Sequence, residues 1–226
     1  RGVGSLLYRR AEAELKNAGV KTLIVGGEMH NFFSGIPEPD EAKKSFFSAM
    51  GFQMNSAVHY DLASDISEID FAHCGVPVNE TGEFETRPMT APDLPETERF
   101  FDAEFPGRWK FEIMRHLSIG GDPHEILLLC REKRVCGFCK IHGNKDAENG
   151  EFNEQLGKNW GALGPIGIAG DVRGAGLGVR LLRDSLKHLQ KTGAHRVNID
   201  WTILKDFYGQ FGFSPWRTYL AAYKDL

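Results

Sequence analysis

The chain has 226 residues, enough for one large or two modest domains that each bury a core. Hydrophobic residues make up 41% and charged residues 26%, and the net charge is −4 with no block of like charges, which gives no support to nucleic-acid binding. No apolar run approaches the roughly 18 to 20 residues of a membrane span, and the start does not resemble a signal peptide, so we expect a soluble, cytoplasmic protein without a membrane partner.

The first predicted elements follow two closely spaced glycines. Gly2-Val3-Gly4-Ser5 opens an amphipathic run that ends at Gly19, and this pattern predicts a helix. A strand is expected over residues 21–25. After a proline-containing connection, the block Phe46-Phe47-Ser48-Ala49-Met50-Gly51-Phe52 predicts a short helix that ends near its Gly-Phe pair and leads into a strand.

A change in composition separates this part from the rest. Residues 63–95 are rich in Asp, Glu, Pro and Thr, and we place a domain boundary near residues 79–84. The predicted domains are residues 1–80, an incomplete and non-catalytic unit, and residues 84–226.

The second domain shows a fuller pattern. Helices are predicted over residues 91–104, 109–117, 179–192 and 204–211; strands over 87–90, 126–130, 134–141, 160–168, 196–202 and 217–223; and a polar loop over 144–158.

Three of the four cysteines, Cys130, Cys136 and Cys139, fall in the apolar segment 126–141. We interpret them as reduced, buried thiols. Cys136 and Cys139 have C-x-x-C spacing, but the pair lies in the middle of a predicted strand, where neither a redox motif nor a zinc site is expected.

The two predicted domains share a pattern. Gly2 and Gly4 align with Gly176 and Gly178 without a gap, and the Phe46–Phe52 block aligns with Phe207–Phe213 after one insertion. Each copy then has the order glycine loop, helix, strand, short helix, strand. The sequence therefore predicts a tandem repeat whose first copy is incomplete.

The glycine loop of the second copy lies between an apolar strand and a helix. This arrangement presents backbone N–H groups to an anion, so a phosphate-bearing ligand is expected. A Walker loop is excluded because no Gly-Lys-Ser/Thr follows, and a dinucleotide fingerprint fits poorly because the preceding strand does not begin a βαβ unit.

Two motifs, R-x-x-G-x-G at Arg173 to Gly178 and F-Y-x-x-F-G-F at Phe207 to Phe213, carry a family resemblance. With the order of elements, they make residues 86–226 resemble the GNAT acetyltransferase superfamily, while the first copy resembles only its C-terminal half. The resemblance implies an α+β fold with a mixed, mostly antiparallel sheet flanked by helices and preceded by a half-GNAT unit. It also implies acetyl-CoA as co-substrate, an amine as acceptor and no metal.

The resemblance also implies which residues bind acetyl-CoA. The strand before the loop would pair its backbone with the pantetheine arm, and the loop would hold the pyrophosphate. The expected cofactor-binding residues are Ile166, Ile168, Arg173, Gly174, Ala175, Gly176, Leu177 and Gly178.

For catalysis, Tyr208 occupies the position whose phenol protonates the departing coenzyme A sulfur in the family, and an N–H near Ile168 would polarise the thioester carbonyl. Phe47 replaces that tyrosine in the first copy, so one active site per chain is expected. Asp200 is the candidate general base, although its position is equally compatible with facing solvent. Trp201 stands where the family often has an asparagine, so the usual contact there is in doubt.

The acceptor is expected to be a small primary amine, with an amino sugar as one candidate. Phe105 and Trp109 either stack on a sugar or pack in the core. The acidic residues Asp146, Glu148, Glu151 and Glu154 either attract a cationic amine or form a solvated loop.

Two further expectations concern alternatives and partners. The alternative function is a non-catalytic acyl-CoA sensor or scaffold. Because an incomplete first copy would expose a sheet edge, we expect a homodimer or an upstream segment to complete it.

Overall fold

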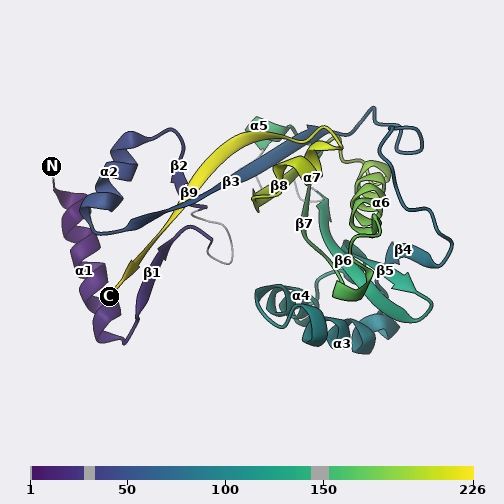
Figure 1. Ribbon diagram of the computed structural model, residues 1–226, viewed down its shortest axis with the longest axis horizontal. Coiled ribbons are helices and arrows are strands. Elements are labelled where there is room, and N and C mark those ends of the chain that lie inside the picture. Colours follow the sequence, from purple (N-terminus) through teal and green to yellow (C-terminus); the bar gives the residue numbers. More distant parts are fainter. Residues whose placement is uncertain (1, 28–33, 144–152) are drawn as a thin grey trace. The chain divides into compact units, whose positions relative to one another are not determined.

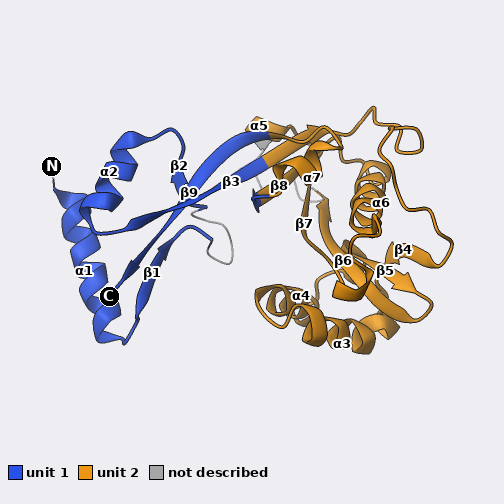
Figure 2. Ribbon diagram, in the orientation of Figure 1, with its two compact units in different colours: residues 1–61, 201–203, 215–226 blue, residues 62–200, 204–214 orange. Residues whose placement is uncertain are grey.

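The computed structural model describes residues 2–27, 34–143 and 153–226 (Figure 1). The chain forms two compact units, shown in Figure 2. Unit 1 contains Arg1–Asp61, Trp201–Ile203 and Pro215–Leu226, and unit 2 contains Leu62–Asp200 and Leu204–Ser214.

Unit 1 is built around the last strand of the chain. Its elements are α1 (Val3–Asn17), β1 (Thr22–Val25), β2 (Ile36–Pro37), α2 (Glu41–Ala49), most of β3 (Gln53–Asp65) and most of β9 (Ser214–Asp225). Both β1 and β2 pair antiparallel with β9, so that Val25 lies opposite Ala222 and Ile36 opposite Leu220. Val25, Ile36 and Ala222 form a small core with Phe52.

Within unit 2 the strand order of the sheet is β8-β7-β6-β5-β4. Its strands are β4 (Phe84–Pro88), β5 (Ile126–Arg131), β6 (Arg134–Gly143), β7 (Trp160–Ile168) and most of β8 (Arg196–Thr202). Its helices are α3 (Leu94–Glu104), α4 (Arg108–Ser118), α5 (Asn153–Leu156), α6 (Leu177–Lys191) and α7 (Lys205–Gly209), with 3-10 turns at Ala91–Asp93, Pro123–Glu125 and Gly170–Val172. Strands β7 and β8 pair in parallel, whereas the pairs among β4, β5, β6 and β7 are antiparallel. The predicted α+β class with a mostly antiparallel sheet is confirmed.

Helices cover both faces of this sheet. Phe138 of β6 packs against Phe101 of α3 and Trp109 of α4. The next residue, Cys139, contacts Ser185 of α6. Because successive side chains of a strand point to opposite faces, α3 and α4 lie on one face and α6 on the other. This double cover explains why β5 is a continuous apolar run whose first five residues are all buried.

The cysteines behave as expected. Cys130, Cys136 and Cys139 are buried free thiols in β5 and β6, and the C-x-x-C pair lies within a strand. Burial raises the pKa of the Cys139 thiol to about 12.

Most predicted elements are found, and the differences have local causes. Helix α6 begins at Leu177, two residues earlier than predicted, because Gly176 in a left-handed conformation is its N-cap. The helix predicted over 204–211 is shorter, and β9 starts earlier, at Ser214. In the stretch predicted as a loop over 144–158, the described residues 153–156 form α5.

The compact units divide the chain differently from the predicted domains. Residues 62–80 belong to unit 2, and β9 belongs largely to unit 1. Composition could indicate a polar connection but not that the last strand returns to the first unit. Both α1-β1-α2-β3 and α6-β8-α7-β9 have the same order, apart from the short β2, and the tandem repeat with domains 1–80 and 84–226 stays a prediction.

Candidate active site

Strands β7 and β8 separate from one another along their length. Their parallel pairing joins Trp160 to Arg196, Gly161 to Val197 and Ala162 to Asn198. Beyond Ala162, β7 continues to Ile168 without further pairs to β8 in the described part of the chain. The two strands therefore diverge, and one edge of β7 is left open to a ligand.

The backbone groups on that open edge can be identified from the hydrogen bonds on the other edge. The N–H of Ala169 donates to the carbonyl of Cys136 at 2.8 Å. Since alternate residues of an antiparallel pair face the partner strand, Gly167 also faces β6, while Ile166 and Ile168 direct their N–H and C=O groups away from it. Both residues predicted to pair with pantetheine therefore present backbone groups to the open edge.

The glycine loop follows directly. Gly174 and Gly176 have φ angles of +79° and +76°, a conformation that side chains other than glycine rarely adopt. Gly176 gives no side-chain cap to α6, whose first N–H groups thus remain without a capping side chain. The loop fits a pyrophosphate, because the backbone N–H groups of the first turn of α6, which no side chain caps, and the helix dipole favour an anion at this point.

Three polar contacts hold the loop. The N–H of Gly170 donates to Glu104 at 2.8 Å, and Arg134 forms a two-pronged ion pair with Asp171 at 2.7 and 2.9 Å. This arginine lowers the pKa of the Asp171 carboxyl. Arg173 is exposed, and its Nε donates to the Ile168 carbonyl at 3.0 Å, so the arginine also links the loop to the end of β7.

The two sequence motifs meet at Gly178. A Cβ atom at this position would lie 3.7 Å from Ile168 and 3.9 Å from the ring of Phe207. The neighbouring Tyr208 is only 5% exposed and packs edge-to-face on Phe207 with ring centroids 5.0 Å apart. The end of β7, the start of α6 and the helix α7 that carries Tyr208 thus converge at one place.

Asp200 lies on β8, where Asn198 and Ile199 are buried and Asp200 itself is exposed. Its side chain is therefore accessible to water. This placement is compatible with a water-relayed base, and the role of Asp200 stays a prediction.

The aromatic residues considered for the acceptor take part in core packing. The rings of Phe105 and Trp109 lie 5.0 Å apart, and both contact Phe138. Phe105 also packs so tightly on Gly167 that a Cβ there would lie 2.7 Å from its ring. Of the acidic candidates, Glu154 is exposed, and Asp146, Glu148 and Glu151 lie outside the described residues.

The end of β8 holds a cluster that the sequence did not reveal. Trp201, in unit 1, has a φ of +46°, which is unusual for a bulky residue. Its backbone N–H donates to Asp61 at 3.1 Å, its indole donates to the carbonyl of Ser34 at 2.9 Å, and its ring stacks on His59. Asp61 also accepts from Tyr219, and burial, with the nearby Asp61 carboxylate, raises the pKa of this phenol to about 12.

Two features are absent from the described residues. No group of three or more His, Cys, Asp or Glu side chains is arranged to hold a metal ion there. None of the described helices is long and apolar enough to cross a membrane.

The sequence model of the Acetyltransferase (GNAT) family matches residues 93–213, more than half of the chain, and includes the open strand, the glycine loop and Tyr208. The chain belongs to the GNAT acetyltransferase family. The family that the model describes is one of acetyltransferases.

Solved structures share the fold. A GCN5-related glucosamine N-acetyltransferase region of a fungal multi-domain GH3 β-N-acetylglucosaminidase has a TM-score of 0.87 at 22% identity, covering 99% of this chain and 28% of that one. A GCN5-related N-acetyltransferase from Sphaerobacter thermophilus has a TM-score of 0.71 at 16% identity, and the match covers 99% of this chain and 68% of that one. A tandem GNAT protein from the clavulanic acid biosynthesis pathway has a TM-score of 0.66 at 15% identity, and the match covers 100% of this chain and 70% of that one.

These identities establish likeness of fold alone. The chain spans about 28% of the length of the fungal protein, so that protein's activity is not transferred to it by the match. No curated protein matches the sequence.

Proposed function

We propose that the chain transfers the acetyl group of acetyl-CoA to a small primary amine by direct attack in a ternary complex. The convergence of Ile168, Gly178 and Phe207 carries the proposal, because it joins the open strand edge, the anion-binding loop and the helix of Tyr208 at one place.

The chain supplies the binding groups in a continuous path. N–H groups between Gly174 and Gly178 would receive the pyrophosphate, and Arg173 would add a charge at the exposed side of the loop. The backbone of Ile166 and Ile168 would pair with the amides of pantetheine. An N–H of the strand around Ile168 would donate to the thioester oxygen as negative charge develops on it.

The transfer then balances in one displacement. The amine nitrogen forms a bond to the carbonyl carbon, and the carbon–sulfur bond breaks with its electron pair going to sulfur. The hydroxyl of Tyr208 donates its proton to that thiolate, and the proton of the amine leaves through water toward Asp200. Tyr208 is later reprotonated from solvent.

An amino sugar is the proposed class of acceptor. Its support is the likeness of fold over 99% of this chain to a region whose name states glucosamine N-acetylation. The panel of acceptors therefore pairs a sugar amine with other small amines.

The test has two stages in one preparation. Calorimetric titration with acetyl-CoA measures binding, and thiol release is then followed with glucosamine, an alkyl diamine and a lysine peptide, with glucose as the matched control that lacks the amine. We expect binding and glucosamine-dependent release. Thiol release with another amine but not with glucosamine would overturn the proposal of an amino-sugar acceptor. Binding of acetyl-CoA without thiol release from any amine would favour the sensor alternative over acetyl transfer.

A partner is proposed for unit 1 on separate grounds. Helix α1 has no buried residue, and Val3, Leu6 and Leu7 are 65%, 70% and 66% exposed. We propose that this face is an interface, with a second copy of the chain as first candidate. Light scattering across a range of concentrations should show a dimer that Leu7→Glu dissociates, and a monomer throughout would contradict it.

A cytoplasmic location is also proposed, on composition alone, and fractionation of expressing cells tests it.

A further inference from the structure

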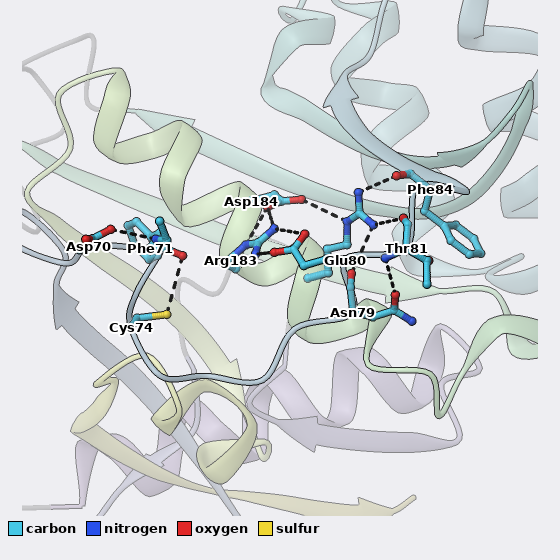
Figure 3. A network of polar contacts seen from close by, with 11 residues as sticks. Asp70, Phe71, Cys74, Asn79, Glu80, Thr81, Phe84, Arg183 and Asp184 are labelled. Carbon is cyan, nitrogen blue, oxygen red and sulfur yellow. Dashed lines mark hydrogen bonds and ion pairs between the residues drawn. The ribbon is translucent and has the colours of Figure 1, made fainter.

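The segment Asn79–Phe84, where composition predicted a boundary, is bound along α6 (Figure 3). Arg180 donates to three of its carbonyls: that of Asn79 at 3.3 Å, that of Thr81 at 2.8 Å and that of Phe84. One turn further along α6, Arg183 pairs with Glu80 and lowers the pKa of that carboxyl.

These contacts make the segment a fixed part of unit 2. The side chains of Arg180 and Arg183 are only 12% and 14% exposed. Water therefore competes little for their charged donor groups, which hydrogen-bond to the segment Asn79–Phe84. At the other end of α6, Gln190 donates to the carbonyls of Ile66 and Ile69. The chain is thus tied to α6 both at the beginning and at the end of the helix.

At the start of α6, Asn79 reaches the glycine loop. Its side-chain amide donates to the carbonyl of Ala175 at 2.7 Å. Its side-chain oxygen accepts from the N–H of Thr81 at 3.0 Å, which fixes the orientation of the amide group. Asn79 also lies 3.5 Å from the place a Cβ of Gly176 would take.

The bonded carbonyl lies at the most adjustable point of the loop. Ala175 stands between Gly174 and Gly176, both with positive φ. Because glycine populates positive and negative φ almost equally, the peptide between Ala175 and Gly176 has little intrinsic barrier against turning over. Turned over, it would present a carbonyl oxygen, rather than an N–H, to an anion.

A planar trans peptide directs its C=O and N–H to opposite sides. While Asn79 holds the Ala175 carbonyl, the N–H of Gly176 must point away from Asn79. We propose that Asn79 is a positioning residue for acetyl-CoA: it holds the Ala175–Gly176 peptide in the orientation that presents the Gly176 N–H to the pyrophosphate. This inference rests on the proposed function of the loop.

Asn79 lies outside residues 93–213, which match the family model. The contact that would orient the loop therefore comes from a segment that precedes the matched region. Asn79 acts on the cofactor only through the loop, so it should alter acetyl-CoA affinity and leave the chemical step alone.

The test compares Asn79→Ala and Asn79→Asp with Glu80→Gln. Both Asn79 variants remove the donor to Ala175, and the aspartate also adds a charge beside the anion site. Glu80→Gln weakens the pairing with Arg183 but does not touch the loop. Far-UV circular dichroism and the melting temperature without ligand establish that each variant is folded. If Asn79→Ala does not fold, Asn79→Asp still tests the inference, because aspartate has nearly the same shape as asparagine.

We expect the Kd and KM for acetyl-CoA to rise about tenfold in Asn79→Ala and at least as much in Asn79→Asp, consistent with one lost hydrogen bond. At saturating acetyl-CoA, kcat and the KM for the amine should match the native protein, and Glu80→Gln should stay within about twofold in every constant.

The inference is overturned if both Asn79 variants keep the native affinity for acetyl-CoA, or if Glu80→Gln loses as much affinity as they do. It is also overturned if kcat of the Asn79 variants falls at saturating acetyl-CoA. If the native chain itself fails to bind acetyl-CoA, the proposed function fails instead, which keeps the two failures distinguishable.

Discussion

Helices α1 and α6 begin alike and are used differently. Each has 15 residues and starts after a left-handed glycine, Gly2 at φ +91° and Gly176 at φ +76°. Helix α6 buries six side chains, among them Leu181 and Leu186, whereas α1 buries none. The glycine-opened helix is therefore a shared local structure, and what differs is the packing around it.

The two helices are also attached differently. Helix α6 rests on β6 and β7 through apolar side chains. Helix α1 is attached through Tyr8, which packs on Phe52, and through Glu12, which pairs with Lys224.

The largest contrast is expected at the capping glycines. Gly176→Asp should reduce acetyl-CoA affinity by more than about a hundredfold, because it adds a strained positive-φ residue and a negative charge at the anion site. Gly2→Asp, the matched change, should leave affinity unaltered. Calorimetry on both variants measures this, and native affinity in Gly176→Asp would refute the assignment of the loop.

The next contrast concerns the tyrosine. Tyr208→Phe should lower kcat by about 10²- to 10⁴-fold with little change in acetyl-CoA affinity, because the phenol acts only on the departing thiolate. Phe47→Tyr, at the aligned position in α2, should not change turnover. Steady-state thiol release is the measurement, and full activity of Tyr208→Phe would remove the role given to the phenol.

Packing gives a third contrast. Leu181 is completely buried, and Leu181→Ala should lower the free energy of unfolding by about 3 kcal/mol through lost contacts and a cavity. Leu7, at the aligned position of α1, is 66% exposed in the single chain, and at protein concentrations where the chain is monomeric Leu7→Ala should change the free energy of unfolding by less than about 0.5 kcal/mol. Chemical denaturation provides both values. A comparable loss from Leu7→Ala would show that the α1 face is covered in solution.

The smallest effect belongs to the polar attachment of α1. A hydrogen bond from Lys224 lowers the pKa of Glu12, so its contribution to stability is complete above about pH 4.3 and is lost as the pH falls through the lower folded-state value. Glu12→Gln should cost at most about 1 kcal/mol at pH 7 and flatten the stability profile below pH 4.3. Thermal unfolding across pH tests this, and an unchanged slope would contradict it.

The sequence predicted what depends on neighbouring residues. The apolar run of β7, the glycines of the loop and the amphipathic pattern of α6 are all local signals, and they locate the loop and Tyr208 in the chain.

Other features depend on contacts between distant segments. The boundary predicted over residues 79–84 is bound to α6, because Arg180 collects carbonyls about a hundred residues away. The left-handed Trp201 is held by Asp61 and Ser34, which no local pattern connects to it. Composition treats such residues as linker or strand end and cannot reveal their partners.

The place of β9 has a consequence for the order of synthesis. Strands β1 and β2 are made early, but both pair with β9, and the core formed by Val25, Ile36 and Phe52 includes Ala222. On the ribosome, therefore, the first unit to be translated is the last to be completed: it must wait, with its apolar residues uncovered, until Pro215–Leu226 emerge.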